Sequence, residues 1–294
     1  MRGTVGAPLP AGATRAPTET EGNDVSTPTG ESTPAPTGTP GEEPLPELDV
    51  THQERQRRWT VLLRLLLLIP QFIVLYVLYL AAVVVVLIGW FAALVMGRLP
   101  GWCFQYLSGY LGYAARVNAY VYLLTDAYPP FAWSAPGHDA GLTLPAQDRL
   151  NRLAVLFRII LLIPAYIVAA VVASGWTVLA FFFWLIVLVL GRVPGPVFGA
   201  SAAALRYELR FMAYTLLVTS AYPKMLFGDD KRVQRGGTGP AATSSDTRPL
   251  LLSTGGKVLL VAMIVLGVLG LGGSGATSTA GLDSAETGTS EFGG

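Results

Sequence analysis

Two long runs of apolar residues dominate the pattern of the chain. No charged residue occurs from Leu65 to Met96, and none occurs from Ile159 to Leu190. A membrane-crossing helix needs about 20 predominantly apolar residues, so each run is longer than one crossing requires. The parts of the runs that follow a proline, 71–96 and 165–190, would each form a helix about 39 Å long. The pattern therefore predicts helices that are integrated in a membrane.

The chain also repeats itself with a shift of 94 positions. The segment "GRLPG" at 97–101 returns as "GRVPG" at 191–195, and "AYP" at 127–129 returns at 221–223. In the same register Arg64 corresponds to Arg158, and Pro70 corresponds to Pro164. Matches at Arg, Pro and Gly in one register indicate a duplicated unit rather than similar apolar composition.

Each repeat has the same predicted parts. A basic segment comes first, and we expect its arginines to extend to the membrane interface while Pro70 and Pro164 bend the chain into the apolar span. Gly and Pro then end the span, because Gly permits the left-handed C-cap and Pro cannot continue the helix. The predicted hinge and turn residues are Gly97, Pro100, Gly191 and Pro194.

A second helix is expected in each repeat, over about 102–126 and 196–220. In the first copy Tyr106, Tyr110 and Tyr113 share one face, and Gly112 and Ala115 lie on the opposite face. Small residues at this spacing allow helices in a membrane to approach closely. We interpret both faces as packing surfaces, and an aromatic binding wall is the alternative.

The predicted fold class is an all-α integral membrane fold of two tandem helical-hairpin repeats plus one C-terminal transmembrane helix, with disordered N- and C-terminal tails. The expected segments are a Pro/Thr/Gly-rich tail (1–50), repeat 1 (51–131), a loop (132–148), repeat 2 (149–227), a basic flexible linker (228–256), a transmembrane helix (257–273) and a second tail (274–294).

The distribution of Lys and Arg predicts how the chain is threaded. Two crossings in each repeat would place the basic segments of both repeats on the cytoplasmic side, as the positive-inside rule requires. Five crossings then leave the N-terminus cytoplasmic and the C-terminus outside the cell membrane, with the hairpins alike in orientation about an axis along the membrane normal. In the rival topology each apolar run is a re-entrant hairpin, and the Tyr-bearing helix lies on the membrane surface.

Composition removes several classes of function. The chain is 52% hydrophobic and 13% charged, whereas soluble domains carry about 25% charged residues. Its net charge of +1 offers no general attraction to nucleic acid. With Cys103, His52 and His138 as its entire Cys and His content, we expect no metal site, and no motif indicates a cofactor or catalytic residues. We therefore expect no enzyme.

Ionisable residues in the second helices are the candidate functional residues, because such residues are costly in a membrane. These candidates are Arg116, Arg206, Glu208 and Arg210. In one hypothesis Glu208 reaches Arg116 across the repeat interface. In another the arginines bind anionic lipid head groups. In the simplest interpretation they extend to the interface and affect only topology.

The pattern "LLLLIP … W … GRLPG … LLTDAYPPF" over residues 55–131 resembles an uncharacterised family of bacterial membrane proteins, frequent in actinobacteria, known as domain of unknown function 4389. Residues 149–230 match its pattern more loosely. The resemblance implies a membrane-embedded module that often occurs in tandem, and it implies no activity.

Two functional interpretations follow from the sequence. The first is a non-enzymatic envelope scaffold that contacts membrane lipid, a partner membrane protein or a second copy of itself. The second is a small transporter or channel component with a path between the two repeats.

Overall fold

The structure is a computed structural model, and it describes residues 45–51, 56–147, 150–229, 247 and 249–287, with side chains as far as Leu271. The chain divides into two units, Met1–Pro36 and Thr37–Gly294, and all the described residues lie in the second. Residues 1–44 and 288–294 of the two predicted tails, and residues 230–246 and 248 of the predicted linker, lie outside the described residues.

The predicted all-helical, membrane-compatible fold class is confirmed. The elements in chain order are β1 (Glu47–Val50), α1 (Arg58–Met96), α2 (Gly101–Val121), β2 (Ala140–Thr143), α3 (Arg152–Leu190), α4 (Gly195–Thr215) and α5 (Thr254–Thr287). Among the described residues, three helices are long and apolar enough to cross a membrane: α1, α3 and the Thr254–Leu271 part of α5. The second helices of the repeats, α2 and α4, are not among them, so the structure does not support the expectation of five crossings.

Helix α1 contacts the rest of the protein along one narrow stripe. Its buried positions recur at helical spacing, and small or polar residues, including Arg64, Gln71 and Gly89, fill many of them. Large apolar side chains such as Phe72, Leu80 and Phe91 are exposed instead. This distribution is the inverse of that of a water-facing helix, whose exposed face is polar. The outer surface of α1 therefore has the character of a surface in contact with lipid.

The two prolines, Pro70 and Pro164, do not interrupt the long helices. Pro70 lies inside α1 and Pro164 lies inside α3, and each helix is continuous over 39 residues. The segment before each proline is therefore part of the same helix as the apolar span, and its position at the membrane interface stays a prediction. A helix loses only one backbone hydrogen bond at an internal proline, and the long apolar stretch on either side sustains it.

The ends of the helices are set by residues that the sequence pattern identifies. Gly97 and Gly191 cap α1 and α3 in the left-handed conformation, with φ of 69° and 68°, as predicted. Helix α2 ends at Val121 and α4 ends at Thr215, about five residues before the predicted ends. After each of these two helices the chain turns through a leucine at positive φ, which is Leu123 in repeat 1 and Leu217 in repeat 2.

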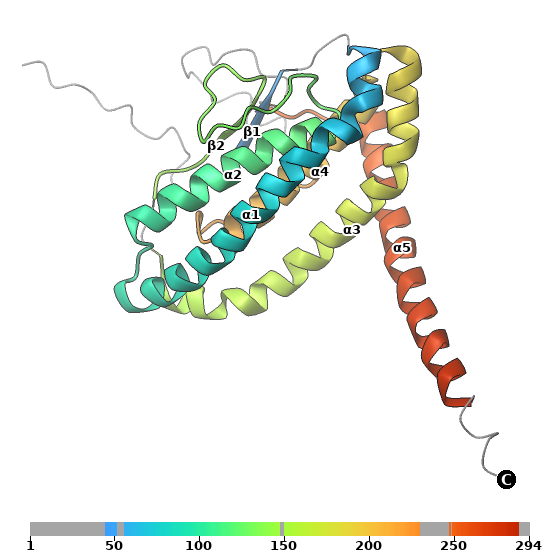
Figure 1. Cartoon of the computed structure of the whole chain (residues 1–294). Coiled ribbons are helices and arrows are strands. Elements are labelled where there is room, and N and C mark those ends of the chain that lie inside the picture. Colours follow the sequence, from blue (N-terminus) through green and yellow to red (C-terminus); the bar gives the residue numbers. More distant parts are fainter. Residues whose placement is uncertain (1–44, 52–55, 148–149, 230–246, 248, 288–294) are drawn as a thin grey trace, which may run out of the picture. The chain divides into compact units, whose positions relative to one another are not determined.

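Helices α1 and α3 run in opposite directions (Figure 1). The backbone N–H of Gln56 donates to Gly191 O at 2.9 Å, and that of Leu150 donates to Gly97 O at 3.0 Å. Along the helices the Trp184 indole donates to Val61 O at 2.8 Å, and the Trp90 indole donates to Val155 O at 3.3 Å. In each of these two pairs of hydrogen bonds, a shift of 94 residues converts one bond into the other. A two-fold axis between the repeats produces such reciprocal contacts.

This arrangement corrects one part of the predicted topology. Like-oriented hairpins would place the start of α1 beside the start of α3, but the start of α1 lies at the end of α3. The pseudo-two-fold relation between the repeats is present, and the two long helices are antiparallel. Charge counts could not reveal this, because they assign a side of the membrane to each segment without stating which ends meet.

Helix α2 packs against α1, and helix α4 packs against α3. The Tyr106 hydroxyl donates to Leu78 O at 3.0 Å and the Tyr113 hydroxyl donates to Gln71, so the tyrosine face of α2 contacts α1. Ala115 and Ala119, on the small face, are fully buried in the main core. Both faces of α2 are thus packing surfaces, as interpreted from the sequence.

A two-stranded antiparallel ribbon, β1 with β2, was not predicted. Its register pairs Leu48 with Leu142 and Val50 with Ala140, and β1 lies in the expected tail 1–50. Leu48 and Val50 are buried, because alternate apolar residues place one face of a strand against a core. Thr247, in the predicted linker, accepts a hydrogen bond from Val50 N at 2.9 Å and donates to Leu48 O at 2.6 Å.

Helix α5 packs against α3 and α4. The closest approach involves glycines: a Cβ on Gly175 would lie 1.8 Å from Met263 O, and a Cβ on Gly267 would lie 1.9 Å from Val171 O. The helix continues to Thr287, past Gly273, where we expected a tail to begin.

Candidate functional site

The same buried arginine site occurs once in each repeat. In repeat 1 Arg64, on α1, donates to Tyr120 O at 2.7 Å and to Thr125 O at 3.0 Å, and its guanidinium lies 4.2 Å from the centre of the Tyr120 ring. Asp126 completes the site with an ion pair at 3.5 Å. A cation that binds the last carbonyls of a helix satisfies them and opposes the negative end of the helix dipole.

Repeat 2 builds the equivalent site from the shifted residues. Arg158 donates to Thr219 O, and its guanidinium lies 3.9 Å from the centre of the Tyr214 ring. Ser220 stands where repeat 1 has Asp126. Arg64 and Arg158 are 2% and 4% exposed, so our prediction that they extend to the membrane interface is wrong. Each reaches inward, where backbone carbonyls of the turn that follows α2 or α4 accept its hydrogen bonds.

The equivalent candidates Arg116 and Arg210 also bind backbone carbonyls. Arg116 donates to Ala132 O. Arg210 donates to Lys224 O at 2.9 Å and to Pro46 O at 3.2 Å. Burial, followed by the neighbouring Arg206, lowers the pKa of Arg210 to about 10, so this guanidinium remains charged at neutral pH. Each arginine holds a connecting segment against its helix.

Arg206 forms a paired contact with an acidic residue beyond α4. Its two terminal nitrogens lie 2.7 Å and 2.9 Å from the carboxylate oxygens of Asp229. Asp229 also accepts from Leu250 N at 3.0 Å. The pair therefore ties the end of repeat 2 to the segment that leads into α5.

Glu208 reaches across the repeat interface, but not to Arg116. Its carboxylate accepts a hydrogen bond from the Tyr122 hydroxyl at 2.8 Å, so the hypothesis of a Glu208–Arg116 pair is wrong. The Tyr122 ring stacks on Trp176, with 4.1 Å between ring centres, and the Trp176 indole donates to the Ser201 hydroxyl at 3.2 Å. Tyr122 belongs to repeat 1 and the other three residues belong to repeat 2. We call these four residues the interface cluster.

The carboxyl of Glu208 lies outside the candidate spans, and burial raises its pKa above 4.5, partly opposed by the hydrogen bond from Tyr122. Since the folded chain then disfavours ionisation, the contribution of this carboxyl to stability is highest below about pH 4.5 and falls as the pH rises toward its folded pKa. Glu208→Gln keeps an acceptor for Tyr122 but cannot ionise. We expect this variant to melt above the parent at pH 7 and level with it at pH 4, measured by tryptophan fluorescence in detergent. A parent that melts above the variant at pH 7 would contradict this.

The predicted turn residues connect the repeats as well as the helices. Gly97 and Gly191 accept the cross-repeat hydrogen bonds described above, and Pro100 and Pro194 are the N-caps of α2 and α4. The turn of each repeat therefore docks on the start of the other.

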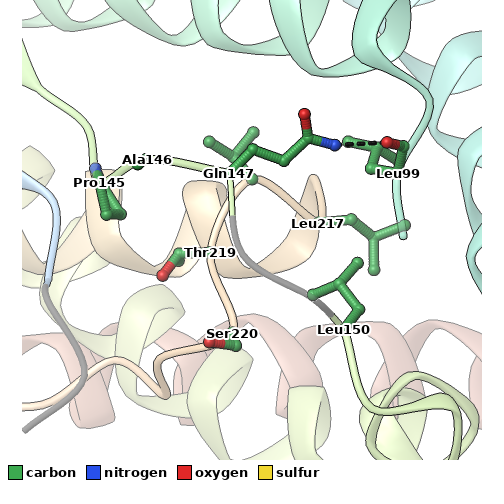
Figure 2. Close-up of a pocket in the computed structure, with 9 residues that line it drawn as sticks. Leu99, Pro145, Ala146, Gln147, Leu150, Leu217, Thr219 and Ser220 are labelled. Atoms are coloured by element: carbon green, nitrogen blue, oxygen red, sulfur yellow. Dashed lines mark hydrogen bonds between the residues drawn. The ribbon is translucent and has the colours of Figure 1, made fainter. Parts of the chain in front are cut away.

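A small pocket lies beside one of these turns, where the connector between the repeats passes the end of α4 (Figure 2). It measures about 270 Å³ when the space open to solvent is included. Gln147 crosses its rim and donates to Leu99 O. Its lining is Leu99, Pro145, Ala146, Gln147, Leu150, Leu217, Val218, Thr219 and Ser220. No charged side chain is among the described residues of this lining.

The described residues contain no group of three or more His, Cys, Asp or Glu side chains that could hold a metal ion. Among the described polar groups, the buried arginines of the two repeats and the interface cluster remain the candidates for function.

Sequence reasoning missed several of these residues. Arg64 and Arg158 were expected to extend to the membrane interface, although their repetition together with Tyr120/Tyr214 and Thr125/Thr219 was visible. Tyr122, Trp176 and Asp229 had no such signal. Leu216 and Ala82 occupy the positions of Tyr122 and Trp176 in the other repeat, so the repeat pattern does not mark them.

Comparisons with known proteins agree with the repeat structure. The profile described as "Domain of unknown function (DUF4389)" matches residues 58–132 and again residues 152–226. The search of curated proteins found no match, and the search of solved structures found none. The two matched segments cover α1 with α2 and α3 with α4, and together they make up half of the chain, so the chain belongs to the DUF4389 family and carries its domain twice.

Proposed function

We propose that this chain is a non-enzymatic scaffold of the cell membrane, which contacts lipid through α1 and α3 and a partner membrane protein or a second copy of itself elsewhere. The single observation that carries the proposal is the inverted distribution of residues on these helices. Arg64, Gln71 and Arg158 are buried, whereas Phe72, Leu80 and Phe181 are among the exposed side chains. Exposure of such a large apolar surface to water is unfavourable, whereas contact with acyl chains removes that cost.

The way the arginines are paired supports a structural role. The guanidiniums of Arg64, Arg116 and Arg210 donate to backbone carbonyls of the same chain, and Arg206 pairs with Asp229. A buried polar group that is satisfied within the fold stabilises one conformation and has fewer donors left for a substrate. This favours a scaffold over a lipid-modifying enzyme.

The alternative is a small transporter or channel component, and the interface cluster is the observation that favours it. A carboxylate between two repeats is a common element of proton-linked transport. Against this, Tyr122 is stacked on Trp176 and in contact with Glu208, and Ala115, Ser201 and Leu205 are at most 1% exposed. Close packing at this interface supports the scaffold.

For orientation, we propose that the N-terminus is cytoplasmic and the C-terminus lies outside, because the segment after Lys257 contains no further Lys or Arg.

Thiol accessibility distinguishes the scaffold from a transport path. The native Cys103 is fully buried, so the parent chain is the background. Ala115→Cys and Ser201→Cys place a thiol at the interface, and Ser134→Cys places one on the exposed connector as the matched control. With a charged, membrane-impermeant thiol reagent applied to open membrane fragments, we expect the interface thiols to react at least about tenfold more slowly than the control. Rates equal to that of Ser134→Cys would support a water-filled path.

A further inference from the structure

We propose that α1 and α3 lie along the membrane within one leaflet, with their outer faces among the acyl chains and their arginine-bearing ends among anionic head groups, instead of crossing from one side to the other. This inference rests on the proposed lipid contact of these two helices. It adds the orientation of the helices and the chemistry of the lipid that surrounds them.

The length of the apolar surface is the first reason. On α1 exposed large apolar side chains continue from Trp59 to Met96, which corresponds to about 57 Å of helix. The hydrocarbon core of a bilayer is about 30 Å thick, and helices that cross it are usually tilted by less than about 40°. A crossing helix would therefore expose much of this surface to water on one or both sides.

The path of the connector between α2 and α3 is the second reason. It begins near Arg64, which binds Thr125 O, and passes Gln71, which donates to Pro129 O at 2.7 Å. It ends at Gly97, which accepts from Leu150 N at 3.0 Å. The connector thus follows α1 from one end to the other.

The middle of the connector would lie at the centre of the bilayer if α1 crossed it. Trp133 is tilted against Tyr106, with 5.3 Å between ring centres, and the Tyr106 hydroxyl donates to Leu78 O, midway along α1. The residues that follow, Ser134, Pro136 and Gly137, are exposed and not helical. Irregular backbone exposed to acyl chains has no partners for its polar groups and does not occur at that depth. The connector must face water, so α1 must lie along the surface.

The positions of the exposed arginines are the third reason. Because the helices are antiparallel, Arg58 and Arg192 lie at one end of the pair, and Arg98 and Arg152 lie at the other; all four are exposed. In a crossing arrangement these cations would be divided between the two sides, against the positive-inside rule. When the helices lie along the membrane, all four are at the surface of one leaflet, where anionic head groups attract them.

Depth measurements test the orientation. Ile73→Cys, Leu80→Cys, Leu87→Cys and Val95→Cys replace exposed residues of α1, and Ser134→Cys is the control at the level of the middle of the helix. Each variant carries a fluorophore on the new cysteine, in vesicles of three parts phosphatidylcholine to one part phosphatidylglycerol. Depth is read from quenching by lipids labelled at different acyl positions.

We expect the four α1 labels to have the same depth to within about one helical turn, about 5 Å, and the Ser134→Cys label to remain in water. A crossing helix would separate Ile73 from Val95 by about 33 Å along the membrane normal, with the deepest label in between, and that profile would overturn the orientation while leaving lipid contact intact. If no α1 label were quenched by lipid, the proposed lipid contact itself would fail.

Discussion

Gly267→Ala should cause one of the largest losses of stability that a single methyl group can produce in this chain. The new Cβ would lie 1.9 Å from Val171 O, and the equivalent atom in Gly175→Ala would lie 1.8 Å from Met263 O. These are backbone atoms in rigid helices, so no side chain can move aside, and α5 would have to separate from α3 by more than about 1 Å. In a membrane the close approach of small residues is itself the source of helix association.

The separation would expose residues that are now fully buried. Leu260 and Met263 are both 0% exposed, and burial of one such side chain stabilises a fold by about 1.5–3 kcal/mol. We therefore expect Gly267→Ala and Gly175→Ala each to lower the free energy of unfolding by about 3 kcal/mol. The measurement is thermal unfolding in detergent, followed by the fluorescence of the six tryptophans.

Gly199→Ala is the matched control for these variants. A Cβ on Gly199, in α4, would meet nothing within 4 Å, and replacement of a helical Gly by Ala stabilises by about 0.5–1 kcal/mol. It should melt at or above the parent. If Gly267→Ala had the same melting temperature as Gly199→Ala, α5 would not pack on α3 through these glycines.

The parts of the fold that were predictable are those set by local sequence. The apolar helices and the Gly97 and Gly191 caps each follow from residues that are close in sequence, and the duplication follows from comparing the sequence with itself. Their spacing determines a helix or a turn without reference to the rest of the chain. The tyrosine face of α2 was predictable for the same reason, because three side chains at helical spacing define a packing face.

The relative placement of these parts was not predictable in the same way. The antiparallel pairing of α1 with α3 depends on contacts such as Trp184 with Val61 and Leu150 with Gly97, between residues far apart in the chain. A charge count cannot distinguish a helix that crosses the membrane from one that lies along it. Strand β1 was missed because residues 1–50 are mostly polar, Pro or Gly. Two apolar residues at the end of that segment, Leu48 and Val50, do not change its average composition.

The candidate residues show the same division. An arginine beside an apolar run can avoid the free-energy cost of an unpaired buried charge in two ways. Its side chain can reach the membrane interface, or it can bind carbonyls inside the fold. The choice for Arg64 depends on whether the end of α2 comes back to it, which is a tertiary contact. The partner of Glu208 is likewise Tyr122, a residue at the end of a helix in the other repeat.

Arg64→Met should destabilise the chain by about 3 kcal/mol or more. The substitution keeps the volume of the aliphatic stem but removes donors from Tyr120 O and Thr125 O, and it leaves Asp126 without its ion-pair partner at 3.5 Å. Removal of one partner of a buried charged pair costs about 3–5 kcal/mol, because the charge that remains has lost its counterion. Asp126 keeps its hydrogen bonds from Arg57 N and the Thr60 hydroxyl, so we expect the lower end of this range. The measurement is again thermal unfolding in detergent.

Two further variants distinguish the loss of this site from the loss of a positive charge. Arg58→Met makes the same change on the same helix at an exposed residue and should alter stability by no more than about 0.5–1 kcal/mol. Arg158→Met removes the equivalent site of repeat 2, and the two sites lie toward opposite ends of the antiparallel pair, so the losses from Arg64→Met and Arg158→Met should add in the double variant. If Arg64→Met and Arg58→Met had the same melting temperature, the hydrogen bonds and ion pair of Arg64 would contribute nothing to stability, and the repeated arginine would have no structural role in the hairpin.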